Sequence, residues 1–343
     1  MKENFDFLMP SVNFFGKGVI EKIGDRAKML NMTKPLIVTD KFLRGMANGP
    51  VAQTLASLDQ AGVSYAIYDG VEPNPKVRNI KAAKQVYLDN DCDSIITVGG
   101  GSAHDCGKGT GIILTNGDDI TKLAGIETLG NPLPPLMAVN TTAGTASTGM
   151  DTFVQLIEPY VLTNRNEITD GQCIAGIKLC EEALREAVAN GHNIEARTKM
   201  VEAEMLGGMA FNNADLGYVH AMAHQLGGQY DAPHGVCCAI LLPVVEKYNL
   251  VAAPERFAEL AKAMGENTEG LSTREAADLA IKAMRQMGDD VNIPRSIKAI
   301  GAKPEDFELM AENALKDGNA FSNPRKGTKE ELVQLFQEAY DAE

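Results

Sequence analysis

Three of the chain's five histidines lie within the stretch Asn212–Gly235. His220 and His224 are four residues apart, so they would share one face of a helix. His234 follows Pro233, where a turn can bring the chain back toward that face. Imidazole is the commonest metal ligand and the side chain that titrates near neutral pH. The stretch therefore predicts a metal site or acid–base chemistry. Surface or core histidines remain the alternative, because no short metal motif such as H-E-x-x-H is present.

A second candidate site is the run Gly99-Gly100-Gly101-Ser102, directly after the apolar segment SIITV. Bare backbone N–H groups at the start of a helix can bind a pyrophosphate. Asp40 ends the apolar segment LIVT, where a carboxylate can bond the ribose 2′-hydroxyl of NAD and would repel the 2′-phosphate of NADP. Both features have a structural alternative, because tight turns need glycine and Asp40 can cap the segment that follows.

Apolar strands alternate with amphipathic helices from residue 34 to residue 140, which indicates βαβ units and a parallel sheet. After residue 150 only helical periodicity remains. We therefore predict an α/β, Rossmann-like domain over residues 1–148 and an all-α domain over residues 149–343. Strands are expected at 35–39, 64–68, 94–98 and 136–140, with an extra strand at 12–15. Helices are expected at 20–30, 51–61, 77–89, 103–115, 174–188, 194–211, 218–226, 236–248, 256–264, 273–287, 306–315 and 329–340.

The composition favours an enzyme of small molecules. The net charge of −14 and the sequence pI near 4.9 argue against nucleic acid or an anionic membrane as partner. The first residues lack the pattern of a signal peptide, and the longest apolar run, 237–245, contains Pro243 and is too short to span a bilayer. Six cysteines without a C-x-x-C pair indicate reduced, mostly buried side chains. We expect a cytoplasmic protein.

Several motifs, in the same order along the chain, resemble those of the iron-containing (group III) alcohol dehydrogenases. They are GGGSAHDCGK at 99–108, TTAGTAS at 141–147, TGMD at 148–151, NNADLGY, VHAMAHQLGG and PHG between 212 and 235, and NAFSNPRKG at 319–327. Residues 314–327 are most similar to the 1,3-propanediol dehydrogenases of that family. The resemblance covers nearly the whole chain. It implies the dehydroquinate synthase-like fold, with an NAD-binding domain followed by a helical metal-binding domain.

The resemblance also implies a metal centre. The family binds a divalent metal, for which we expect Fe²⁺ with Zn²⁺ as the alternative, through an Asp and three His. Asp151, His220 and His234 match three of these ligands, and Gln155 stands where the remaining His is expected. An amide oxygen is a poorer ligand than imidazole, so we expect weakened or absent metal binding. If Asp151 is not a ligand, it would cap a helix over 152–160.

His224 resembles the family's histidine near the nicotinamide, and it is the candidate catalytic proton relay; a helix histidine bonded to a backbone carbonyl is its structural alternative. For NAD, the resemblance assigns the ribose to Asp40 and the pyrophosphate to the glycine run. The cofactor-binding positions that it implies are Asp40, Gly99, Gly100, Gly101, Ser102, Asp105, Thr141, Thr142 and Thr145.

Relatives in this family carry a further segment after the position of Ser147, whereas this chain passes directly to Thr148. The predicted function is NAD- and metal-dependent interconversion of a short primary alcohol or diol, such as 1,3-propanediol, and its aldehyde, in a homo-oligomer. Gln155 and the missing segment keep a second hypothesis open, a catalytically impaired member that binds nucleotide or oligomerises without turnover. A third is glycerol dehydrogenase-like or dehydroquinate synthase-like chemistry on polyols, against which the PHG and NPRKG motifs count.

Overall fold

The computed structural model describes residues 7, 12–123 and 129–343, and the chain divides into two compact units. One unit is Phe14–Thr142, and the other contains Ala143–Glu343. The sequence placed the boundary at residue 148, whereas the structure divides the chain after Thr142. The boundary lies earlier than residue 148 because the first helix of the second unit already begins before it. Thr145 and Thr148 cap the first turn of this helix, which packs against other helices of the second unit.

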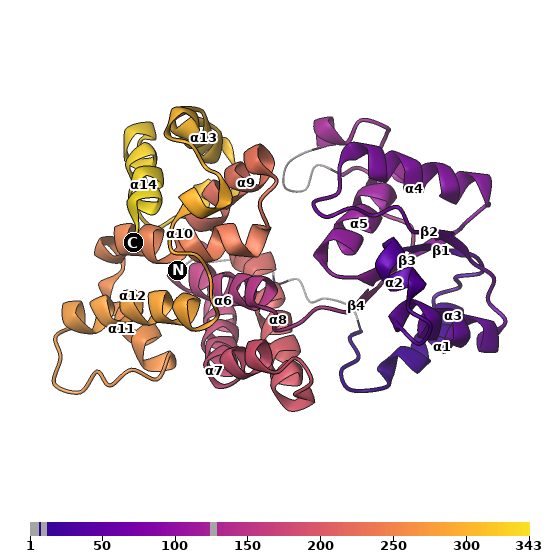
Figure 1. Ribbon diagram of the computed structural model, residues 1–343, viewed down its shortest axis with the longest axis horizontal. Coiled ribbons are helices and arrows are strands. Elements are labelled where there is room, and N and C mark those ends of the chain that lie inside the picture. The colour runs from indigo at the N-terminus through magenta and orange to yellow at the C-terminus, as the bar shows by residue number, and fades with distance from the viewer. Residues whose placement is uncertain (1–6, 8–11, 124–128) are drawn as a thin grey trace. The chain divides into compact units, whose positions relative to one another are not determined.

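The first unit contains a four-stranded parallel sheet (Figure 1). Its strands are β1 (Pro35–Val38), β2 (Ala66–Tyr68), β3 (Ser94–Gly99) and β4 (Leu136–Asn140), in the order β2-β1-β3-β4. The two central strands, β1 and β3, are buried along their whole length, which explains why their sequences are mostly apolar. The four strands lie where the alternation predicted them. The extra strand predicted at 12–15 is wrong, because these residues adopt no strand structure.

Helices of the first unit are α1 (Ile23–Met29), α2 (Lys41–Gly45), α3 (Pro50–Ala61), α4 (Val77–Asp89) and α5 (Gly101–Thr115). Successive side chains of a strand point to opposite faces of a sheet. Leu36 and Val38 therefore belong to a core shared with α4 and α5, whereas Ile37 belongs to a core shared with α1 and α3. Both faces of the sheet are covered, as the predicted α/β, Rossmann-like class requires.

In the described part of the second unit, every regular element is a helix (Figure 1). One continuous core of buried apolar side chains joins these helices, as the helical periodicity predicted. They are α6 (Ala146–Val161), α7 (Glu167–Ala189), α8 (Ile194–Ala214), α9 (Tyr218–Tyr230), α10 (His234–Asn249), α11 (Pro254–Ala263), α12 (Thr273–Asp290), α13 (Phe307–Lys316) and α14 (Lys329–Asp341), with shorter 3-10 turns between some of them.

Helix α10 is buried along most of its length and continues through Pro243, as the helix predicted at 236–248 required. By length and composition alone, His234–Ala252 could cross a membrane, with a mean hydropathy of 1.5. However, 72% of this segment is buried inside the protein. Its apolar sequence is therefore explained by packing within the helical core.

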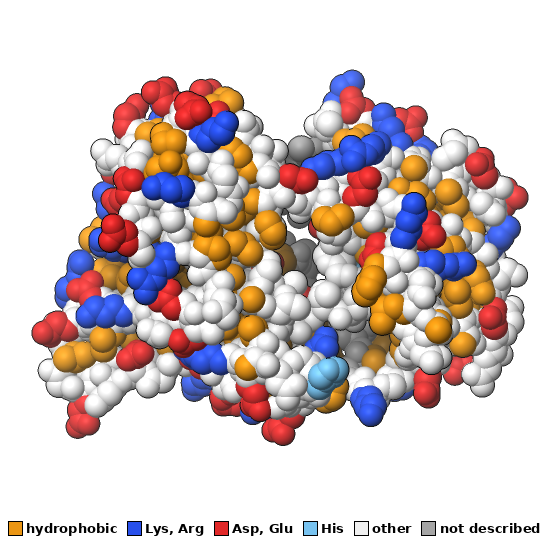
Figure 2. Space-filling model, viewed as in Figure 1, with side chains coloured by type: hydrophobic (Ala, Val, Ile, Leu, Met, Phe, Trp, Pro, Cys, Tyr) orange, Lys and Arg blue, Asp and Glu red, His pale blue; other side chains and the backbone are white. Residues whose placement is uncertain are grey.

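Charged side chains of both signs are interspersed over the face shown in Figure 2. Apolar side chains appear between them, as on most folded surfaces. On this face the acidic side chains are therefore not gathered in one patch.

Candidate metal centre and cofactor-binding residues

Three helices of the second unit bring Asp151, His220 and His234 together. Asp151 lies in the second turn of α6, His220 in the first turn of α9, and His234 is the first residue of α10. Oδ1 of Asp151 is 3.5 Å from Nε2 of His220 and 3.5 Å from Nε2 of His234. The chain therefore does return at His234 to the face of His220. The idea that Asp151 caps its helix is wrong, because α6 begins earlier and its cap is Thr145.

The facing atoms of this trio fit a metal ion. Oδ1 of Asp151 and Nε2 of His220 are buried and have no hydrogen-bond partner, a situation that costs about 1–3 kcal/mol per group if nothing else compensates it. Two ligands about 2.1 Å from one ion at the tetrahedral angle stand about 3.4 Å apart, close to the observed separations. Burial lowers the pKa of His234 below its ordinary value, which favours the neutral imidazole that binds metals.

Gln155 lies one turn after Asp151 on α6, on the face where the missing histidine was expected. Its Nε2 atom donates a hydrogen bond to Oδ2 of Asp151 at 3.0 Å. The amide thus orients the carboxylate so that Oδ1 points toward the two imidazoles. In this arrangement Gln155 supports the carboxylate of Asp151.

The thiol of Cys238 lies at the same cluster. Cys238 is one turn after His234 on α10, and its Sγ atom is 3.6 Å from Nε2 of His234. One potential ligand atom from each of Asp151, His220, His234 and Cys238 lies within 4.8 Å of every other. All six cysteines are unpaired and buried, but sequence reasoning assigned no role to Cys238. The available signal was its i, i+4 spacing from His234.

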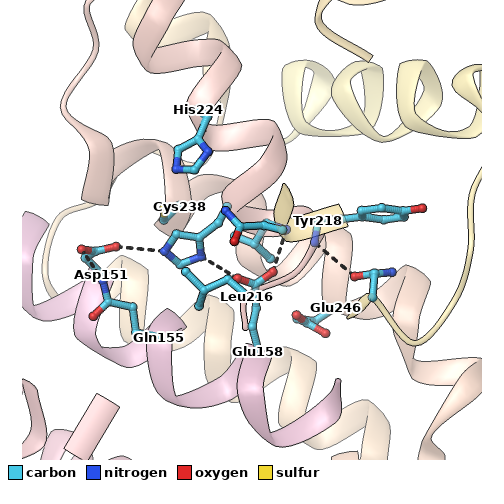
Figure 3. A network of polar contacts seen from close by, with 12 residues as sticks. Asp151, Gln155, Glu158, Leu216, Tyr218, His224, Cys238 and Glu246 are labelled. Carbon is cyan, nitrogen blue, oxygen red and sulfur yellow. Dashed lines mark hydrogen bonds and ion pairs between the residues drawn. The ribbon is translucent and has the colours of Figure 1, made fainter. Parts of the chain in front are cut away.

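A fully buried carboxylate, Glu158, orients His220. Its Oε2 atom is 2.5 Å from Nδ1 of His220, and its Oε1 atom accepts the backbone N–H of Val219 at 2.8 Å. Figure 3 shows Asp151 and Glu158 on opposite sides of one imidazole ring. The proton is thereby held at Nδ1, and Nε2 is left for a metal. Sequence reasoning missed Glu158, although it lies two turns after Asp151 on the same helix.

A second buried carboxyl group, Glu246 of α10, stabilises this arrangement by remaining neutral. Burial, and then the negative charge of Glu158, raise the pKa of Glu246 well above its ordinary value. Its Oε2 atom accepts a hydrogen bond from Nδ2 of Asn249 at 3.2 Å. Because Glu246 is neutral, the core beside Glu158 does not hold another buried negative charge.

His224 lies one turn after His220 on α9 and is bonded to Asp317, not to a backbone carbonyl. Nδ1 of His224 is 2.7 Å from Oδ2 of Asp317, the residue before the short 3-10 helix η6 (Gly318–Ser322). Burial raises the pKa of Asp317, but hydrogen bonds from His224 and from the backbone N–H of Asn319 outweigh burial and lower it below its ordinary value. Asp317 is therefore ionised at neutral pH. It was also missed by sequence reasoning, although it lies in the segment 314–327.

In the first unit, the glycine run joins β3 to α5. Gly100 is the N-cap of α5, and Gly101 is its first residue. A Cβ atom on Gly99 would lie 2.6 Å from Cβ of Ala103, and one on Gly100 would lie 2.7 Å from Oγ1 of Thr142. A Cβ atom on Gly101 would meet nothing within 4 Å. The first two glycines permit close packing, and the space at Gly101 leaves the helix N-terminus open to a phosphate.

Two of the predicted threonines lie beside the glycine run. The backbone N–H of Thr141 donates to the carbonyl of Gly99 at 2.9 Å, which continues the pairing of β3 with β4 and places Thr142 next to Gly100. Ser102 and Asp105 follow on α5, and Asp105 is exposed.

Asp40 caps α2, with Oδ1 accepting the N–H of Leu43 at 2.9 Å. This is the capping role that the sequence offered as the alternative to ribose binding. A carboxylate has a second oxygen, so capping does not exclude a bond to a ribose hydroxyl. Asp40 follows β1, which pairs with β3, and it therefore lies at the same sheet edge as the glycine run. Thr145 belongs to the second unit, where its hydroxyl caps α6.

Two family models match the chain. The C-terminal domain of the Fe-containing alcohol dehydrogenase family matches residues 145–340, and the iron-containing alcohol dehydrogenase model matches residues 10–156. The chain belongs to the iron-containing alcohol dehydrogenase family. The resemblance inferred from the motifs is confirmed. The predicted fold is confirmed as well, because solved structures that match nearly the whole chain have this fold.

Relatives of this iron-containing alcohol dehydrogenase are oxidoreductases. The 1,3-propanediol dehydrogenase of Citrobacter freundii is 48% identical, over 98% of this chain and 99% of the relative. The lactaldehyde reductase of Escherichia coli (strain K12) is 34% identical, over 95% and 97%. The structure of an alcohol dehydrogenase from Oenococcus oeni is 68% identical with a TM-score of 0.94, over 98% of this chain and 100% of that one. The present protein is therefore an enzyme of alcohol and aldehyde oxidoreduction.

The alignment with the Citrobacter enzyme extends over 382 positions, more than the 343 residues of this alcohol dehydrogenase. The relative therefore carries residues that this chain lacks. Their expected place, between Ser147 and Thr148 in the first turn of α6, stays a prediction. The shorter chain retains the three donor groups of Asp151, His220 and His234.

Proposed function

We propose that this enzyme uses NAD and a bound divalent metal to interconvert a short primary alcohol or diol, such as 1,3-propanediol, and its aldehyde. The observation that supports the proposal most is the convergence of Asp151, His220 and His234, in which Oδ1 of Asp151 and Nε2 of His220 are buried without hydrogen-bond partners. Buried polar atoms of this kind destabilise a protein unless a ligand compensates them. In the noncatalytic alternative, no bound ligand compensates the burial of these atoms, so this alternative is not favoured.

The trio is proposed to hold Fe²⁺, with Zn²⁺ as the alternative. When bound, the metal supplies a Lewis acid that lowers the pKa of the substrate hydroxyl, and NAD supplies the hydride acceptor. Gln155 fixes the carboxylate of Asp151, and Glu158 fixes the tautomer of His220. Both supporting residues come from α6, so one helix positions two of the three ligands.

His224 is proposed as the proton relay. Because Asp317 accepts the proton at Nδ1, Nε2 of His224 is the nitrogen that can accept the proton of the alcohol and later return it. The carboxylate of Asp317 stabilises the imidazolium that forms. The side chain of His224 is 42% exposed, so the proton can pass on to solvent.

For NAD, we propose that the backbone at Gly99–Ser102 binds the pyrophosphate and that Asp40 binds the adenosine ribose. The carboxylate of Asp40 would repel a 2′-phosphate, which supports a preference for NAD over NADP. Asp105, Thr141, Thr142 and Thr145 are proposed to lie along the cofactor, as the family resemblance implies.

The substrate class is proposed from the relatives named for 1,3-propanediol and lactaldehyde, both small oxygenated molecules. We propose further that the enzyme works in the cytoplasm as a homo-oligomer, without nucleic acid or membrane as partner. The acidic composition supports the absence of polyanionic partners.

Turnover after metal exchange tests the proposed function. Wild-type protein stripped of metal and reloaded anaerobically with Fe²⁺ should form NADH from NAD and 1,3-propanediol, and the stripped protein should not. His220→Ala should lose both metal and rate, whereas His192→Ala, at an exposed turn, should keep both. Failure of the reloaded wild type to reduce NAD with any short alcohol would favour the noncatalytic alternative.

A further inference from the structure

The metal trio leaves a place for a fourth protein ligand, and two side chains stand near it. Gln155 uses its amide nitrogen on Oδ2 of Asp151, and its neutral oxygen is a weak ligand for a transition metal. Cys238 is fully buried and lies at the cluster itself (Figure 3). Of the two, Cys238 has the stronger donor atom.

The position of Cys238 matches that of a ligand. A thiolate sulfur about 2.3 Å and an imidazole nitrogen about 2.1 Å from one ion, at the tetrahedral angle, stand about 3.6 Å apart. Sγ of Cys238 is 3.6 Å from Nε2 of His234. Nε2 of His220, a residue that is only 1% exposed, faces the same cluster without a hydrogen-bond partner. The cysteine therefore does not stand alone, because a buried and unpartnered nitrogen points to the same ion.

We propose that the Cys238 thiolate is a direct ligand of the metal, which makes the centre an Asp, two His and one Cys. The inference rests on the proposed metal centre and adds a ligand to it. On binding, the thiol proton leaves to solvent and the sulfur takes the metal in its place. His234 and Asp151 remain 38% and 22% exposed, so one side of the centre stays open to a substrate oxygen. A thiolate also shifts the preference of the site toward softer ions such as zinc.

Cobalt substitution of the full chain tests this ligand without measuring activity. A cobalt(II) ion bound by a thiolate shows a sulfur-to-metal charge-transfer band in the near ultraviolet, which oxygen and nitrogen ligands do not give. Wild type loaded anaerobically with cobalt(II) should show this band. Cys238→Ser should lose the band and bind cobalt at least about tenfold more weakly, since even an outer-shell partner is worth that much.

Cys237→Ser is the matched control, because Cys237 is the adjacent buried cysteine and is not part of the cluster. It should keep the band. Bound cobalt without a charge-transfer band in wild type would overturn the Cys238 ligand while leaving the trio intact. Absence of cobalt binding in wild type would overturn the trio as well.

A second measurement avoids any dependence on how the serine variant folds. X-ray absorption at the zinc edge of zinc-loaded wild type should show one sulfur scatterer at about 2.3 Å, together with nitrogen and oxygen neighbours. A shell of nitrogen and oxygen alone would contradict the proposal.

Discussion

Oε2 of Glu158 lies 2.5 Å from Nδ1 of His220, inside the core of the helical unit. The Glu158 side chain is fully buried, and that of His220 is almost so. Because Nδ1 is engaged, Nε2 must face Asp151. A buried carboxylate on α6 thus decides which nitrogen of a histidine on α9 is available to a metal.

Replacing Glu158 by glutamine should therefore weaken metal binding. We expect Glu158→Gln to lower the affinity about 10- to 100-fold, the usual effect of losing a carboxylate behind a ligating histidine. Glutamine keeps the size of the side chain and can still accept the N–H of Val219. Metal titration monitored by bound-metal analysis checks the result, with Glu202→Gln at an exposed position of α8 as control. Equal affinity in both variants would contradict the orienting role.

Asp317 should matter for proton transfer but not for metal content. In Asp317→Asn the imidazolium of His224 loses its negatively charged partner, so we expect kcat to fall by about 100-fold, at the lower end of acid–base effects. KM should change little. Measurement of kcat and KM for the variant and the wild type checks this. A wild-type kcat in Asp317→Asn would remove His224 from the proposed proton path.

Gly101→Ala should separate cofactor binding from folding. The added methyl group meets nothing within 4 Å in the protein, and alanine is favourable in the first turn of a helix. It would, however, occupy the space over the N-terminus of α5, where we place the pyrophosphate. We expect a wild-type melting temperature and weaker NADH binding in a fluorescence titration. Gly171→Ala, which also has open space around its Cβ position on α7, is the control. Undiminished NADH affinity in Gly101→Ala would argue against this pyrophosphate site.

Asp93 should make the stability of the protein depend on pH in the acid range. Its carboxylate accepts the N–H and hydroxyl of Thr33, the N–H of Lys34 and the hydroxyl of Ser94, at the amino ends of the neighbouring strands β1 and β3. Burial raises the pKa of Asp93, but these hydrogen bonds outweigh it and hold the pKa below its ordinary value. A carboxyl group whose pKa is lowered by folding stabilises the protein above its unfolded pKa, about 3.9. That contribution is lost as the pH falls through the folded value.

Asp93→Asn should therefore destabilise the protein at pH 6 and have little effect at a pH below the folded pKa of Asp93. Urea unfolding of both proteins across this range, followed by circular dichroism, measures the difference. The gap between variant and wild type should narrow as the pH falls. A gap of equal size at every pH would mean that the charge of Asp93 does not stabilise the fold.

Local patterns predicted much of this structure. Strand 94–98 and helix 77–89 follow from apolar runs and periodicity that tertiary packing does not override. The start of α6 was missed because the hydroxyls of Thr145 and Thr148 cap each other, a feature that no apolar period reveals. Helix α10 continues through Pro243 because burial on all sides holds it in place.

The sequence predicted only those site residues that stand in recognisable motifs. His220, His234 and Asp151 stand in recognisable motifs, and the structure brings them together. Glu158 and Asp317 were missed because their histidine partners lie far along the chain, and such pairs form only after the helices pack. Cys238 was missed because a lone thiol on an apolar helix is ordinarily core.

The most direct test of the metal centre is a crystal of the protein loaded with Fe²⁺ or Zn²⁺, examined by anomalous scattering at the edge of the bound metal. We expect one strong peak in the second unit, within about 2.3 Å of Oδ1 of Asp151 and of Nε2 of His220 and His234. A loaded crystal with no peak between these three residues, or with its metal bound elsewhere, would contradict it.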